Sequence, residues 1–212
     1  MLDTLWLQKN ASLVTLPDGS SIYQHKQGQK ISSDNQNFND LLYERFSRCS
    51  TQTVKVLELG AGNGINMIML KKKFPLWDLT GVEIDQEQVE LASYNCNLLN
   101  LDIKIAMDDL RTFKGEIMYD LIIANPPYKK VGTGRLSPYK RNNLAKFELT
   151  CTMQDVFAAI KRNVCPGGEA WLLYSLDRKD DLMKLISNEK VKKIKLIKKD
   201  KIIITGLKYD TN

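Results

Sequence analysis

Asn125-Pro126-Pro127-Tyr128 is the stretch of this sequence whose residue types most clearly suggest chemistry. Its two prolines remove backbone N–H donors, so the local main chain offers only carbonyl acceptors. Proline also keeps the preceding residue extended, which leaves the Asn125 amide free to project from the end of a strand. An amide oxygen and a neighbouring carbonyl can accept both hydrogens of an –NH2 group. These acceptors direct the nitrogen lone pair toward an electrophilic methyl group.

The remaining features of this motif suit a planar amine. Tyr128 offers an aromatic face, worth about 1–3 kcal/mol if the acceptor is a nucleic-acid base. A general base is not required, because the leaving proton becomes acidic only after the nitrogen has gained positive charge. The single histidine, His25, therefore does not limit this mechanism. The alternative is a rigid strand-to-loop turn with Tyr128 packed; we predict a catalytic role for Asn125, Pro126, Pro127 and Tyr128.

A glycine-rich loop, Glu58-Leu59-Gly60-Ala61-Gly62-Asn63-Gly64, lies between an expected strand and an expected helix. Glycines there permit a tight turn and a close approach of the backbone to a ligand. The dinucleotide-binding fingerprint requires its third glycine at position 65, where Ile65 stands, and the Gly-Lys-Ser/Thr ending of a phosphate-binding loop is missing. From this loop we predict the cofactor ligands Glu58, Gly60, Ala61, Gly62 and Gly64.

Carboxylates stand at the ends of the next two expected strands. Glu83 can accept both ribose hydroxyls of an adenosine group, with Ile84 beside it, while Asp85 caps the next helix. Asp109 can accept the adenine amino group, and Leu110 can contact the ring. The alternative for Glu83 is a solvated carboxylate. Three successive strand ends therefore predict one adenosine-binding site.

The 212 residues are 43% hydrophobic and 26% charged, as in ordinary globular proteins. The apolar runs are too short to span a bilayer and no secretory signal opens the chain, so we expect a cytoplasmic protein. The four cysteines lack metal-clip spacing, and we expect free thiols and no metal. The net charge of +6 suits a polyanionic partner, although a solvated lysine-rich face explains it equally well.

Strand-like and helix-like patterns alternate along the chain, which predicts an α/β fold with a doubly wound, mostly parallel sheet. Residues 1–50 are expected to form an extension, with a hairpin at Pro17-Asp18-Gly19-Ser20 and a helix capped by Ser33 or Asp34 that runs to Phe46. Further helices are expected at Ile65–Lys73, Asp85–Leu99, Asn143–Arg162 and Asp180–Ser187. The expected strands are Val54–Leu59, Asp78–Glu83, Asp102–Ala106, Tyr119–Ala124, Glu169–Tyr174, Val191–Ile197 and Lys201–Gly206, with a turn at Pro166-Gly167-Gly168.

With these motifs the chain resembles class I Rossmann-like methyltransferases of the methyltransferase small domain type. Within that group it is similar to bacterial tRNA(1Val) adenine N6-methyltransferases. The glycine loop matches motif I and Asn125 to Tyr128 matches motif IV, while Arg141 to Lys146 resembles the segment that follows it. The segment Lys30 to Asp34 resembles the one beside the cofactor, although Asn35-Gln36-Asn37 is more polar than the family's apolar helix opening.

This resemblance implies one methyltransferase domain over residues 1–212, with a seven-stranded sheet, helices on both faces and an antiparallel final strand. It implies S-adenosylmethionine as cofactor, with Lys30, Ser33, Asp34 and Asn125 among its ligands. The expected substrate is adenine N6 in tRNA near the anticodon, and the expected state is a monomer. Neighbouring RNA phosphates are expected at Lys129, Lys130, Arg135, Lys140, Arg141 and Lys146.

Other acceptors share the same –NH2 geometry. Glutamine N5-methyltransferases of release factors normally carry an N-terminal helical domain, and about fifty residues before the glycine loop are too few for it. Guanine N2 in ribosomal RNA is a further alternative. DNA adenine enzymes usually need a separate recognition domain, for which this length leaves no room. A non-catalytic RNA-binding protein that still binds S-adenosylmethionine remains the alternative outside the enzymes.

Overall fold

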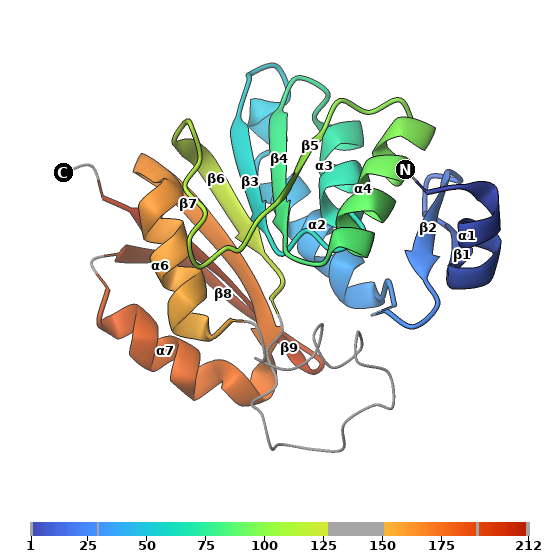
Figure 1. Ribbon diagram of the computed structural model, residues 1–212. Coiled ribbons are helices and arrows are strands. Elements are labelled where there is room, and N and C mark those ends of the chain that lie inside the picture. Colours follow the sequence, from blue (N-terminus) through green and yellow to red (C-terminus); the bar gives the residue numbers. More distant parts are fainter. Residues whose placement is uncertain (1, 29, 127–150, 190, 211–212) are drawn as a thin grey trace.

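A seven-stranded sheet forms the centre of the computed structural model, which describes residues 2–28, 30–126, 151–189 and 191–210 (Figure 1). The strand order is β5-β4-β3-β6-β7-β9-β8. The strands are β3 (Lys55–Leu59), β4 (Asp78–Glu83), β5 (Lys104–Met107), β6 (Tyr119–Ala124), β7 (Val164–Ser175), β8 (Val191–Lys199) and β9 (Ile202–Tyr209).

Parallel pairing joins β5, β4, β3, β6 and β7 in that order. β9 runs antiparallel to both of its neighbours, β7 and β8. This arrangement confirms the predicted mostly parallel sheet with an antiparallel final strand. The carboxyl ends of β3, β4 and β6 therefore meet at one edge, where ligands bind in sheets of this type.

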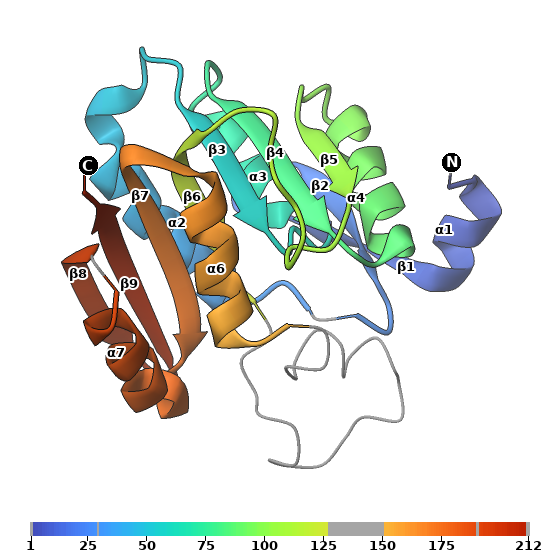
Figure 2. The ribbon, with the colours of Figure 1, turned by 60° about the vertical axis from the view of Figure 1, so that its left-hand side comes forward.

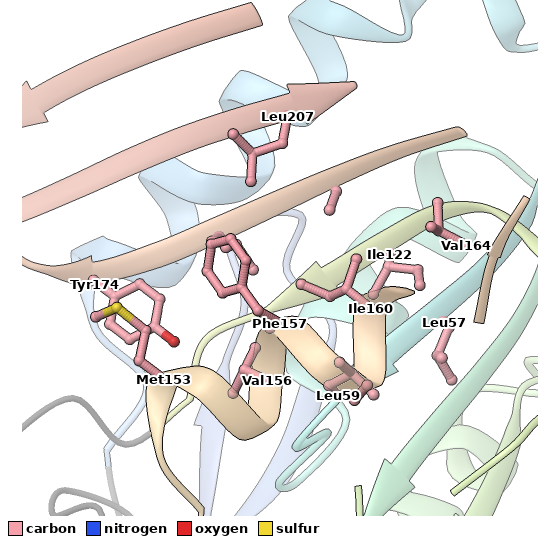
Figure 3. Packing of buried hydrophobic residues seen from close by; sticks show 14 of the residues in the cluster. Leu57, Leu59, Ile122, Met153, Val156, Phe157, Ile160, Val164, Tyr174 and Leu207 are labelled. Atoms are coloured by element: carbon pink, nitrogen blue, oxygen red, sulfur yellow. The ribbon is translucent and has the colours of Figure 1, made fainter. Parts of the chain in front are cut away.

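Helices cover both faces of the sheet, as predicted (Figures 1 and 2). One face packs against α2 (Ser33–Arg45) and α3 (Ile65–Lys73), with α4 (Gln86–Leu98) beside α3. The other face packs against α6 (Met153–Asn163) and α7 (Lys179–Ser187). Figure 3 shows Phe157 and Ile160 of α6 turned toward the strands. Their three-residue spacing places both on one side of the helix, so that side is buried.

The N-terminal extension contains the predicted hairpin, made by β1 (Ala11–Thr15) and β2 (Ser21–His25). The preceding helix α1 (Thr4–Asn10) was not predicted; Asp3 caps it by accepting the backbone N–H of Trp6. The Asn95 amide on α4 accepts from the backbone N–H of Tyr23 and donates to its carbonyl, both at 2.8 Å. These two bonds attach the hairpin to α4.

Several predicted boundaries were wrong, for local reasons. Ser32 caps α2 instead of Ser33 or Asp34, because its hydroxyl and the Asn35 amide form a reciprocal capping box. The helix predicted over Asn143–Arg162 begins in the described residues only at Met153, since Thr152 is extended and caps α6, and residues 143–150 lie outside the described part of the chain. The turn predicted at residues 166–168 lies inside β7, where Gly167 has a φ of 76° and the register with β6 is irregular.

Short 3-10 helices occupy Ser47–Cys49 and Leu176–Arg178. β5 begins at Lys104, two residues later than predicted, and β7, β8 and β9 all extend past their predicted ends. Within the described ranges, no helix has the length and apolarity needed to cross a bilayer.

Candidate functional site

A cavity of about 180 Å³ opens at the carboxyl edge of β3, β4 and β6. It brings together most of the residues predicted to bind a cofactor or to carry the reaction. Those that line it are Lys30, Glu58, Gly60, Ala61, Gly62, Glu83, Ile84, Asp109, Leu110, Asn125 and Pro126. Residues about a hundred positions apart in the sequence, such as Lys30 and Asn125, therefore line the same cavity.

Three predicted cofactor residues do not line this cavity. Ser33 and Asp34 lie in the first turn of α2, and the cavity instead takes Ile31 and Asn35 from this segment. Gly64 is the N-cap of α3 with a φ of 84°, and a Cβ there would lie 3.3 Å from the Cβ of Ala92 on α4. Gly64 thus permits close packing of α3 against α4.

The glycine loop is held in shape by backbone bonds to β4. The N–H groups of Gly60 and Ala61 donate to the Val82 carbonyl at 2.9 and 3.0 Å. Gly60 and Gly62 have φ angles of 75° and 54°, a region that side chains disfavour, and a Cβ at either would meet no atom within 4 Å. The loop therefore leaves open space beside its backbone, as a bound ligand requires.

Glu83 closes β4 and accepts three backbone N–H groups. Its Oε2 accepts from Gly62 at 2.9 Å, and its Oε1 accepts from Ile84 and Asp85, both at 2.9 Å. Burial raises the pKa of the Glu83 carboxyl, and these backbone bonds oppose that shift. Asp85 accepts the backbone N–H of Glu87 and caps α4, which confirms its predicted capping role.

Glu58 is 1% exposed and faces the cavity from β3. Its Oε1 accepts from the Asn66 side chain at 2.7 Å, while its Oε2 is buried without a hydrogen-bond partner in the described part of the chain. Burial raises the pKa of Glu58 to about 8, with the Asn66 bond lowering it and the charge of Glu83 raising it. A buried carboxyl with a free oxygen suits a cationic group of a ligand.

Asn125 follows β6 and lines the cavity together with Pro126. Its Oδ1 is buried and accepts no hydrogen bond from any described residue. Such an acceptor costs stability unless a ligand supplies the missing donor. Pro127 and Tyr128 lie outside the described residues, as do all the predicted RNA contacts: Lys129, Lys130, Arg135, Lys140, Arg141 and Lys146.

Asp109 is paired with a neighbour that sequence reasoning did not identify. Arg111 Nε donates to both of its oxygens, at 3.0 and 2.8 Å, and this pair lowers the pKa of Asp109. Sequence reasoning also missed Asn66, which faces Glu58. The sequence feature that could have identified Asn66 is a polar residue between Ile65 and Met67, in the otherwise apolar first turn of α3. Over the residues that the structure describes, no group of three possible ligands could hold a metal ion.

Comparisons with protein families, curated relatives and solved structures all find methyltransferases. The sequence model of a family described as "Methyltransferase small domain" matches residues 37–201. A release factor glutamine methyltransferase of Streptococcus pneumoniae is 39% identical over 75 residues, 35% of this chain and 26% of that protein. A tRNA1(Val) (adenine(37)-N6)-methyltransferase of Histophilus somni is 31% identical over 153 residues, 70% of this chain and 64% of that protein. The chain thus spans less than two thirds of the length of either relative.

Among solved structures, a 16S rRNA N2 methyltransferase from Thermus thermophilus, determined with AdoMet and guanosine, superimposes with a TM-score of 0.66. The match covers 94% of this chain and 50% of that chain at 19% identity. At this identity the likeness concerns the fold alone.

Proposed function

Because the chain belongs to the methyltransferase small domain family, we propose that it transfers the methyl group of S-adenosylmethionine to adenine N6 in tRNA, near the anticodon. The observation that carries this proposal is the Asn125 side chain. Its Oδ1 is buried at the cavity wall and lacks a donor among the described residues. An exocyclic amino group supplies the missing donor.

The reaction then follows from what Asn125 does to that amino group. When bound, S-adenosylmethionine would supply an electrophilic methyl group on a sulfonium, whose methyl–sulfur bond breaks as the nitrogen bond forms, so that the cofactor leaves as a neutral thioether. Asn125 Oδ1 accepts one N–H of the substrate and orients the nitrogen lone pair for attack. Positive charge develops on the nitrogen as the new bond forms, and the Asn125 dipole stabilises it. The surplus proton leaves to water after this step, so the mechanism needs no basic side chain.

The cavity residues fit the cofactor on three counts. The glycine loop offers open space beside Gly60 and Gly62, where a side chain would intrude. Glu83 keeps acceptor capacity on Oε2, which accepts a single backbone N–H and suits a ribose hydroxyl. Glu58 presents a buried oxygen without a partner in the described chain, which suits the ammonium group. The same proposal treats residues 1–212 as one methyltransferase domain, with the N-terminal extension of residues 1–50 packing beside the cofactor site.

Charge supports RNA as the substrate class. Residues 191–210 contain seven lysines and two aspartates, a net charge of +5 in a chain whose total is +6. Lys198, Lys199 and Lys201 stand at the carboxyl end of β8, the same edge of the sheet as Asn125. β8 is three strand positions from β6, about 14 Å. Phosphates a few nucleotides from a bound base lie within this reach.

Release factor glutamine is the second candidate acceptor, favoured by the 39% identity to the Streptococcus enzyme. Labelled S-adenosylmethionine, incubated with unmodified tRNA in one tube and release factor in another, separates the two. We expect N6-methyladenosine in the tRNA by nucleoside mass analysis. Label confined to the release factor would replace adenine by glutamine, and label in neither would contradict both acceptors.

A further inference from the structure

Three asparagines connect α2 and α3 to the cofactor cavity. Asn66, on α3, is 3% exposed, and its Oδ1 accepts from the side chains of Asn35 at 3.1 Å and Asn39 at 2.9 Å. Its Nδ2 donates to Glu58 Oε1 at 2.7 Å. We call Asn35, Asn39 and Asn66 the asparagine relay.

The relay has only one consistent orientation. Rotating the Asn66 amide by half a turn would set its oxygen against the Glu58 carboxyl and its –NH2 against two donors. The two amides on α2 therefore fix which end of Asn66 faces Glu58. Glu58 Oε1 is engaged as a result, and Oε2 is the oxygen left without a described partner.

Asn35 extends this connection to the segment before α2, which lines the cavity. Its Oδ1 accepts the backbone N–H of Ser32 at 3.2 Å, as part of the cap of α2. The two residues before Ser32, Lys30 and Ile31, line the cavity. The position of this wall and the orientation of Glu58 thus depend on the same amide.

Packing of α2 on α3 does not explain the relay. Apolar residues of similar volume at these buried positions would serve a helix contact as well or better, because buried polar groups contribute little net stability. Asn39 Oδ1 is itself buried without a partner among the described residues, which adds a cost. The chain retains three amides beside a carboxyl that faces the cavity, and this points to a role in ligand binding.

We propose that the asparagine relay is a positioning device for cofactor recognition: it holds Glu58 so that its free oxygen binds the ammonium group of the cofactor. Asn66 itself lines the cavity, and in this role it acts through Glu58 instead of by contact with the ligand. The inference rests on the proposed function, since it requires that the cavity bind S-adenosylmethionine or its product.

Two ligands separate this role from a structural one. S-adenosylhomocysteine and 5′-methylthioadenosine share the adenosine and the thioether, and only the first carries the amino-acid ammonium. In Asn66→Ala we expect the affinity for S-adenosylhomocysteine, measured by calorimetry, to fall about tenfold or more. The affinity for 5′-methylthioadenosine should stay within about twofold. Glu58→Gln should give the same selective loss, and adding Asn66→Ala to it should cause little further loss.

Asn163→Ala is the matched control. Asn163 is also a buried asparagine, 1% exposed, but its amide bonds Gly115, Phe113 and Ala159, outside the cavity lining. The Asn163→Ala substitution should lower thermal stability and leave unchanged the ratio of the affinities for S-adenosylhomocysteine and 5′-methylthioadenosine. If Asn66→Ala does not fold, Asn35→Ala is measured in the same way and decides the question.

The outcomes separate the relay from the proposed function. Equal losses for both ligands, or no loss for either, would overturn the relay while leaving the cofactor assignment intact. A wild-type protein that binds neither ligand would overturn the cofactor assignment, and the relay with it.

Discussion

Glu83 accepts the backbone N–H of Gly62 at 2.9 Å, which joins the glycine loop to the end of the neighbouring strand β4. The other oxygen of the same carboxyl accepts from Ile84 and Asp85. One side chain therefore shapes the loop on one side of the cavity and the start of α4 on the other. Under the proposed ribose role, Glu83 would couple ligand binding to the geometry of the loop.

Glu83→Gln should lower the affinity for S-adenosylhomocysteine about tenfold or more and reduce thermal stability. A glutamine has one acceptor oxygen where the carboxylate has two, so backbone N–H groups on one side lose their partner. Calorimetry and thermal unfolding measure the two effects. Glu116→Gln, at an exposed carboxyl outside the cavity lining, is the control and should change neither. An unchanged affinity in Glu83→Gln would rule out the ribose assignment.

Glu58 should make the stability of the ligand-free protein decrease as pH rises. Burial raises its pKa from 4.5 to about 8 in the folded protein. Between these values the unfolded chain has released a proton that the folded chain still holds, so the free energy of unfolding falls as pH rises. A tenfold difference in proton affinity is worth about 1.4 kcal/mol, so the loss across this window is on the order of 5 kcal/mol.

Glu58→Gln removes this titration. Its free energy of unfolding should exceed that of the wild type by a margin that grows from about pH 5 to about pH 8. Urea unfolding at several pH values measures the margin. Glu116→Gln should follow the wild-type curve. A constant difference between Glu58→Gln and wild type over this range would show that Glu58 titrates normally.

The parallel core of the fold was predictable because its signals are local. Apolar runs that end in glycine, in a carboxylate or before Asn125-Pro126 located β3, β4 and β6, and the predicted bounds of α3, β4 and β6 match the structure. Helix α1 has only seven residues, and its apolar positions do not distinguish a short helix from a strand. The Pro-Gly-Gly sequence was interpreted as a turn, whereas it forms an irregularity inside β7.

The cavity was predictable as far as it depends on strand ends, since topology brings these to one edge. The asparagine relay could not be predicted from the sequence, because Asn35 and Asn66 are 31 residues apart and meet only through packing of α2 on α3. Asn35 was noted for being more polar than expected at a helix opening. Its partner on another helix could not be inferred from that helix alone.

Two exposed lysines at the end of β8 should contribute to tRNA binding. The double variant Lys198→Glu with Lys201→Glu should lower tRNA affinity about tenfold, and the slope of log affinity against log salt should become shallower by about one for each phosphate that is no longer neutralised. The control pair, Lys55→Glu with Lys114→Glu, changes net charge equally; Lys55 begins β3 at the opposite edge of the sheet. Equal losses from the two pairs would indicate a general charge effect instead of a binding surface.

Asn125→Ala should separate activity from stability. Without the amide oxygen the substrate amine is not oriented, and we expect turnover to fall about a hundredfold or more while cofactor affinity changes by less than about threefold. The substitution also removes a buried acceptor that has no described partner, so the thermal midpoint of the free protein should stay level or rise.

Asn125→Asp keeps an acceptor oxygen at this position and should retain part of the turnover. Methyl-transfer rates, calorimetry and thermal unfolding on the same preparations test these expectations together. A destabilised alanine variant would mean that Asn125 is held by contacts that stabilise the free protein. Wild-type turnover in that variant would remove Asn125 from the mechanism.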